Sequence, residues 1–317
     1  MRYYDIRLLQ GNQVVRSWTS HPNGKYDPHA LDVEFDMPIS PGHLPNGAQT
    51  ISIYGVALQD LVQAQQFTGM TLEIRGGMQA GLPLANPKQA GLLVAGEVFQ
   101  SFGNWEGTDM TLDFVVVGSP FTLKSPGPIV LNWVAGMTLT QALTQCFAVA
   151  YPGIPASIHI APDIVQNHDE KAMYATFDQL ASAVEQLTRL RFQQPVYMVN
   201  LGGEISVFDL NYRPTPIQFA FTDFVGQPTW IKTNEMQVKT VLRGDIQPGS
   251  LIKMPKGLQD NPGIILTAAA AFPSQIRYKS TFSGNFLVQQ VRHIGRFRTP
   301  DGAAWVTVAN CNALQLS

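Results

Sequence analysis

The sequence is short of charge. Asp, Glu, Lys and Arg make up 14% of its 317 residues, whereas an average soluble domain has roughly 25%. A protein that stands alone in water usually carries more surface charge. Two interpretations follow: an assembly covers part of the surface, or the surface is neutral and rich in Gln and Thr. The net charge of -2 excludes capture of nucleic acid or anionic lipid by overall charge.

Cysteine and long apolar runs are scarce as well. Cys146 and Cys311 are the only cysteines. Two thiols are too few for a disulfide framework or a zinc site, so we expect a reducing compartment. No run approaches the roughly 20 apolar residues of a membrane span, and the N-terminus has no apolar signal core. We therefore expect synthesis in the cytoplasm and no membrane association.

Motifs of common active sites are missing. The sequence contains no H-E-x-x-H, G-x-S-x-G, Walker loop or G-x-G-x-x-G. Its six histidines show no metal-ligand spacing. His21, Asp27 and His29 share one loop, where a solvated loop is a simpler interpretation than a metal site. We predict that the protein is not an enzyme and uses no cofactor or metal.

The hydrophobic pattern changes twice along the chain. Residues 1–122 and 213–317 consist of short apolar runs and alternating segments typical of β-strands. Between them, residues 123–212 contain two helical patterns, capped at Thr138 and Thr176. We predict a mainly β fold with an α+β insertion: two similar antiparallel β-barrel (tube-like) domains that flank a small α+β domain, with these three ranges as the domains.

The two β regions repeat one order of elements. Each has a strand, a connection, a Gly-led strand, a loop and a final hairpin, at residues 91–118 in the first and 284–311 in the second. The first hairpin has Glu106 and Asp109 at its turn. The second is predicted to have a basic turn formed by Arg292, His293, Arg296 and Arg298. This order predicts a structural repeat.

One strand of the first region is acidic on one face. Asp32, Glu34 and Asp36 alternate with apolar residues, which places their side chains roughly 6.6–6.8 Å apart. Three interpretations stay open. The carboxylates form a solvated face, serve a carbohydrate-active enzyme or binding module, or line a channel that repels a DNA backbone.

Both ends of the chain resemble one family. The segments "ISIYGV", "GMTLEIRGG" and "GLLVAGEVFQSF", with "VLRGDIQPGSLIKMP" and the last hairpin, resemble the tube domains of bacteriophage baseplate (tail) hub proteins. The hub part of type VI secretion spikes is similar. In the C-terminal part the resemblance rests on Pro248, Gly249, Gly284, His293, Gly295 and Trp305.

The resemblance implies a structural protein of the virion tail baseplate, assembled in the host cytoplasm. Its partners would be two further copies of itself in a homotrimer, the tail tube or tube-initiator protein, the central spike and other baseplate proteins. The pseudo-sixfold ring would join the hexameric tube to the trimeric spike and leave a channel for DNA in transit. A hub of a bacterial contractile secretion spike is an alternative.

The resemblance also suggests roles for the charged residues. Asp32, Glu34 and Asp36 would face the lumen. The four residues of the basic turn would contact a neighbouring subunit or the spike; a solvated turn and non-specific nucleic-acid binding are the alternatives.

Overall fold

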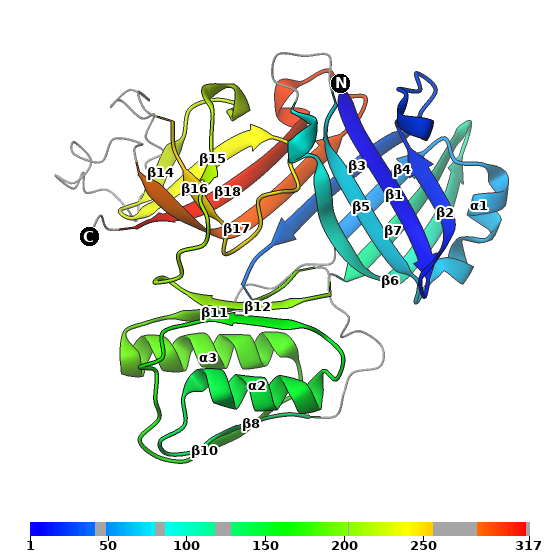
Figure 1. Ribbon diagram of the computed structural model, residues 1–317. Coiled ribbons are helices and arrows are strands. Elements are labelled where there is room, and N and C mark those ends of the chain that lie inside the picture. Colours follow the sequence, from blue (N-terminus) through cyan, green and yellow to red (C-terminus); the bar gives the residue numbers. More distant parts are fainter. Residues whose placement is uncertain (42–48, 80–85, 118–127, 202, 256–283, 315–317) are drawn as a thin grey trace.

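The computed structural model describes residues 1–41, 49–79, 86–117, 128–201, 203–255 and 284–314. Figure 1 shows two β regions side by side above a smaller part that contains two helices. The fold is mainly β, as predicted. The first region contains β1 (Arg2–Gln10), β2 (Gln13–Thr19), η1 (Pro22–Gly24), β3 (Asp32–Ile39), β4 (Gln49–Tyr54), α1 (Leu58–Val62), η2 (Ala64–Phe67), β5 (Thr71–Met78), η3 (Pro87–Gln89), β6 (Gly91–Glu106) and β7 (Asp109–Val117).

The remaining elements follow the same chain order. The inserted part contains β8 (Ile129–Trp133), α2 (Leu139–Ala150), β9 (Ala156–His159), β10 (Glu170–Tyr174), α3 (Phe177–Phe192), β11 (Val196–Asn200) and β12 (Ile205–Asp209). The second β region contains β13 (Ile217–Gln218), η4 (Phe221–Asp223), β14 (Thr229–Lys232), β15 (Glu235–Val241), β16 (Leu251–Lys253), β17 (Asn285–Arg296), η6 (Gly302–Ala304) and β18 (Trp305–Ala313).

A single sheet runs through both β regions. Its strand order is β14-β15-β18-β17-β3-β4-β7-β6-β5-β1-β2, with β16 on β17 and β13 on β16. The long strand β17 joins the regions because its first residues pair with β16 and its last residues pair with β3. The sequence did not predict this continuity.

Three hydrophobic clusters lie under these elements. One fills the first β region and also takes in Tyr197 and Phe208 of the inserted part and Trp305 of the second region. The other two belong to the inserted part and to the second β region. The limits of the three domains stay predictions, since residues 118–127, around the first limit, lie outside the described residues.

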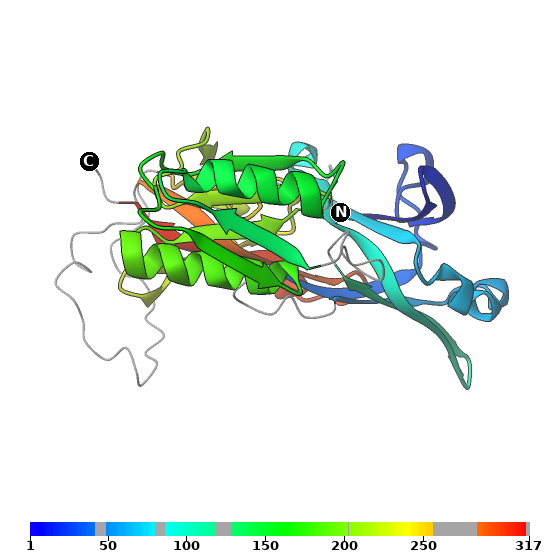
Figure 2. The same cartoon turned by 90° about the horizontal axis from the view of Figure 1, so that it is seen from below.

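The inserted part is a layered α+β unit. Its helices lie between the pair β8–β10 and the sheet β11–β12–β9 (Figures 1 and 2). Thr138 forms the predicted capping box with Gln141, and Thr176 accepts a hydrogen bond from the Gln179 N–H. Since Phe208 on the outer face of this sheet packs in the first region's core, the insertion is fixed against the β regions.

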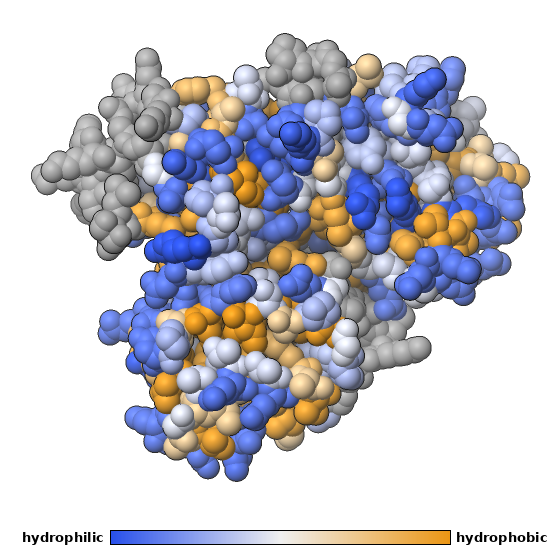
Figure 3. Space-filling view, in the orientation of Figure 1, coloured by the Kyte–Doolittle hydropathy of each residue, from blue (hydrophilic) through white to orange (hydrophobic). Residues whose placement is uncertain are grey.

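The surface and the thiols agree with the composition. Figure 3 shows apolar and polar residues mixed over the visible face. Both cysteines are buried and free, and burial raises the pKa of the Cys146 thiol to about 11. Among the described residues, no helix has the length and apolar character needed to cross a membrane.

Candidate assembly surface

The two predicted sets of charged residues lie on neighbouring strands. Antiparallel pairing of β3 with β17 sets Glu34 opposite Arg296 and Asp36 opposite Ile294. The acidic strand and the predicted basic turn are far apart in the sequence. The structure brings them together at the junction between the two β regions.

One ion pair bridges this junction. The Arg292 Nε lies 2.6 Å from Asp36 Oδ1, and a second contact joins Nη2 to Oδ2. This hydrogen-bonded pairing raises the pKa of the Arg292 guanidinium. Both side chains stay about half exposed, at 54% and 44%, so the pair contributes only about 0.2–1 kcal/mol.

The predicted basic turn is wrong in its placement. Arg292, His293 and Arg296 lie within strand β17, and only Arg298 lies in the loop that follows. The His293 side chain is fully buried and therefore does not reach this chain's surface. Its Nδ1 lies 2.9 Å from the Thr307 hydroxyl, and burial lowers the pKa of the imidazole to about 3.

Two arginines fasten the loop after β17 to the first region. The Arg298 backbone N–H donates to Asp32 Oδ1 at 3.1 Å, and its guanidinium donates to the carbonyls of Pro28 and Ala30. The Arg2 guanidinium donates to the carbonyl of Arg296 at the end of β17 and to three loop carbonyls, those of Phe297, Thr299 and Asp301. Both arginines thus hold structural contacts at the junction.

The predicted repeat exists in the sheet. The first region has the order β3-β4-β7-β6-β5 and the second has β14-β15-β18-β17-β16. Each strand occupies the same place in chain order, and all of these pairs are antiparallel.

The register of the two copies also agrees. One row of directly paired residues runs across four strands of the first copy: Asp36, Thr50, Val115 and Gln100. The corresponding row in the second copy is Thr229, Gln237, Asn310 and Gln290. In both copies the last pair follows a β-bulge, which begins at Val98 and at Val288.

A turn that is hydrogen-bonded to the first residue of the bulge is also the same in both copies. Val98 donates its N–H to the Met70 carbonyl and accepts from the Gly69 N–H, both at 2.8 Å. Val288 makes the same two bonds, at 2.8 Å each, with Gly249 and the residue after it. Gly69 and Gly249 have φ values of +81° and +88°, a conformation that glycine adopts without strain. These contacts establish the equivalence of the copies residue by residue.

The acidic face continues beyond β3. By register, Glu34 lies opposite Ser52 and Ser52 lies opposite Asp113, so their side chains share one face. Asp113 accepts hydrogen bonds from Ser52 at 2.5 Å and from Asn104 at 3.0 Å. A hollow of about 430 Å³ on this face is lined by Tyr54, Asn104, Glu106, Asp109, Thr111 and Asp113.

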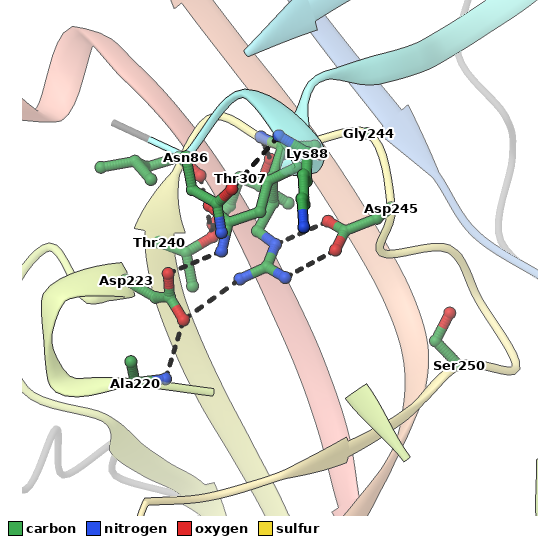
Figure 4. A network of polar contacts seen from close by, with 12 residues as sticks. Asn86, Lys88, Ala220, Asp223, Thr240, Gly244, Asp245, Ser250 and Thr307 are labelled. Atoms are coloured by element: carbon green, nitrogen blue, oxygen red, sulfur yellow. Dashed lines mark hydrogen bonds and ion pairs between the residues drawn. The ribbon is translucent and has the colours of Figure 1, made fainter. Parts of the chain in front are cut away.

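A buried ionic network, which the sequence did not predict, lies at the end of the second copy of the repeat. The Arg243 side chain is 2% exposed and pairs with Asp245 at 2.6 Å and Asp223 at 3.5 Å (Figure 4). Gln89 of the first region donates to Asp223 at 2.7 Å. Gly91 packs so closely on Gly244 that a Cβ on Gly244 would lie 2.6 Å from the Gly91 backbone. The network therefore ties the two regions together at a second place.

The metal-site candidate gains no support in the structure. His21 Nδ1 lies 2.9 Å from the Ser20 hydroxyl, and Asp27 accepts the His29 N–H. Within the described part of the chain, no three His, Cys, Asp or Glu side chains are arranged to hold a metal ion.

The fold, with its duplicated sheet, is similar to that of solved phage tail and type VI secretion proteins. No family model and no curated protein matches the sequence. Two of the solved structures with a similar fold are described here. The E. coli c3393 protein, a type VI secretion component described as similar to bacteriophage T4 tail proteins gp27 and gp5, is 8% identical, with a TM-score of 0.52 over 90% of this chain and 74% of that one.

The second structure is a phage tail protein. The 43 kDa tail protein of prophage MuSo2 from Shewanella oneidensis is 9% identical, with a TM-score of 0.50 over 98% of this chain and 96% of that one. At such identities the similarity concerns the fold alone. At that level, the resemblance to tail hub proteins and secretion spikes is confirmed.

Proposed function

We propose that the chain is the structural hub of a phage tail baseplate, a homotrimeric ring between the hexameric tail tube and the trimeric central spike. The observation that carries this proposal is the repeat, since two equivalent sheets per chain give six similar units in a trimer. Closed rings are the usual outcome for homo-oligomers. Such a ring matches a sixfold partner on one face and a threefold partner on the other.

The charged face would line the channel of this ring. Each copy of the hairpin has a charged residue six positions after the glutamine of the paired row: Glu106 in the first and Arg296 in the second. In a trimer, acidic and basic positions would alternate around the lumen. Asp32, Glu34, Asp36 and Asp113 would keep the wall from binding a passing DNA backbone, because like charges repel.

The proposed contact to a partner subunit or the spike is narrower than the sequence predicted. Arg292 and Arg296 have exposed side chains on β17. His293 is buried and is left out, and Arg298 donates to two backbone carbonyls of its own chain. We propose that Arg292 and Arg296 contact the spike rather than a neighbouring subunit.

Two alternatives differ in their support. A hub of a bacterial contractile secretion spike has the same fold and would be distinguished by the neighbouring genes. A carbohydrate-active role lacks a specific observation in its favour, since Asp36 is paired with Arg292 and Asp32 accepts backbone N–H groups from Val33 and Arg298.

The proposed ring can be tested by measuring the mass of the assembly and by imaging its symmetry. Light scattering or native mass spectrometry at micromolar concentration is expected to give a trimer of the 34.8 kDa chain. Negative-stain images are expected to show a ring with near-sixfold density. A stable monomer would contradict the proposal.

A further inference from the structure

Among the described residues, only the second copy of the repeat has a neighbouring strand along the outer edge of its final hairpin. After the bulge, β17 pairs along one edge with β3. Its equivalent β6 pairs along one edge with β7, and no strand of the described residues pairs with its other edge after Val98. From Phe102 to Glu106 every residue is exposed. Figure 2 shows the β6–β7 hairpin, in teal, reaching beyond the body of the molecule.

A matching edge lies at the far end of the same sheet. Strand β14, the equivalent of β3, pairs with β15 and with no other strand among the described residues. Seven strand spacings separate β14 from β6 in the strand order, roughly 34 Å along the sheet at about 4.8 Å per spacing. Within one chain the two edges are not paired with each other.

We infer that β6 of one chain pairs with β14 of a neighbouring chain, in the register that β17 and β3 have within the chain. This inference rests on the proposed ring and specifies its contact. Within the chain, the residue four positions after Gln290 pairs with Asp36. Gln100 and Thr229 are the equivalents of Gln290 and Asp36, so Asn104 of one chain lies opposite Thr229 of the neighbouring chain.

The side chains at this junction fit the same register. Within the chain, Gly295 lies opposite Phe35, whose ring occupies the space of the absent Cβ: a Cβ there would lie 2.1 Å from Phe35 Cζ. In the intermolecular pair the equivalents are Trp105 and Pro228, so the aromatic ring comes from the other strand. Trp105 is 63% exposed in the single chain, and packing on the proline ring would cover its apolar face.

The intermolecular junction also lacks the ion pair. The equivalents of Arg292 and Asp36 are Phe102 and Thr229, and Phe102 is 41% exposed. Pro228 has no N–H to give, so its pair has one hydrogen bond fewer; proline is tolerated at such edges. The neighbouring chains are therefore joined by backbone pairing and two aromatic side chains rather than by charge.

Disulfide trapping tests the register. The Phe297 N–H donates to the Val33 carbonyl, so these two residues form a hydrogen-bonded pair. Hydrogen-bonded and non-hydrogen-bonded pairs alternate along antiparallel strands. Ile294 and Asp36, three residues along, are therefore a non-hydrogen-bonded pair, and so are their equivalents Asn104 and Thr229. Cα atoms in such pairs lie about 4.5 Å apart, within the range for a disulfide. Mild oxidation of Asn104→Cys/Thr229→Cys is expected to give covalent dimers and trimers.

The controls separate the register from the ring. The shifted pair Asn104→Cys/Gln227→Cys and each single variant are expected to give at least tenfold less cross-linked product, since diagonal neighbours lie about 7–8 Å apart. Equal yields for both pairs, or none from a protein that light scattering shows to be trimeric, would overturn the pairing and leave the proposed function standing. A monomer at every concentration would overturn both.

The aromatic contact has its own test. Trp105→Ala is expected to raise the concentration at which the trimer dissociates at least tenfold, and Trp105→Phe to preserve most of the assembly. Leu190→Ala, at an apolar site on α3 that is 80% exposed, is the matched control and is expected to change nothing. Unchanged dissociation of a folded Trp105→Ala protein would contradict the contact.

Discussion

The two β regions share a row of strands but differ in the connection that follows β4 and β15. In the first region, residues 55–70 form α1 and η2, which pack on β6 and β7. In the second, residues 242–250 hold the buried Arg243. The helix leaves no room for a side chain on Gly103, whose Cβ would lie 2.8 Å from the Leu61 carbonyl oxygen. The equivalent residue in the second region is His293. The same strand order thus encloses different side chains in the two copies.

The largest expected effect is a loss of unfolding free energy when the buried arginine of the second connection is replaced. Arg243→Met leaves Asp223, which is 6% exposed, without its cation. Removing one partner of a buried ion pair costs about 3–5 kcal/mol. Urea denaturation followed by circular dichroism is expected to show this loss.

The matched control is Arg16 of β2, which pairs with a residue of the first connection. Arg16 lies 3.1 Å from Asp60 of α1, but its side chain is 33% exposed. Arg16→Met is expected to cost no more than about 1 kcal/mol, because solvent screens the pair. Equal losses for the two variants would contradict the comparison.

The second effect is a pH dependence that comes from His293 of the second region. Burial lowers the pKa of His293 from its ordinary value of 6.5 to about 3 in the folded chain. The unfolded chain therefore binds a proton between these values and the folded chain does not, so stability is lost as the pH falls below 6.5. The loss is expected to approach about 1.4 kcal/mol per pH unit.

A variant isolates this contribution from the carboxylates that titrate in the same range. His293→Gln removes the titrating ring, so its unfolding free energy is expected to fall less between pH 7 and pH 4.5 than that of the unaltered chain. Parallel curves for the two proteins would mean that His293 does not carry the dependence.

The third effect concerns the packing at the junction. Gly295→Ala would push its Cβ into Phe35, which is buried against Trp305 at a ring distance of 5.3 Å. Overpacking of this kind costs about 1–3 kcal/mol. Gly302→Ala meets nothing within 4 Å and is expected to change the unfolding midpoint little. A neutral Gly295→Ala would show that the Phe35 ring moves aside freely.

The sequence predicted the repeat because turn glycines and alternating strands are local patterns. It did not predict that β3 pairs with β17, since strands about 250 residues apart leave no local pattern. One sign was present: Glu34 and Asp36 share one face of their strand, Arg292 and Arg296 share one face of theirs, and opposite charges favour cross-strand neighbours. Arg243 could not be found, because a single arginine beside a turn is usually exposed and only the fold buries it.

The smallest expected effect contrasts the two junctions. Asp36→Asn removes the ion pair with Arg292 from the junction within the chain, and the exposed fractions of both side chains limit the loss to about 0.2–1 kcal/mol. Salt at about 1 M shortens the screening length to about 3 Å and is expected to reduce this difference further in urea denaturation. The intermolecular junction has Phe102 and Thr229 at these positions, so the trimer fraction is expected to stay the same between 0.1 M and 1 M salt. A trimer that dissociates in high salt would mean that charge, rather than the β6 edge and its aromatic residues, joins the subunits.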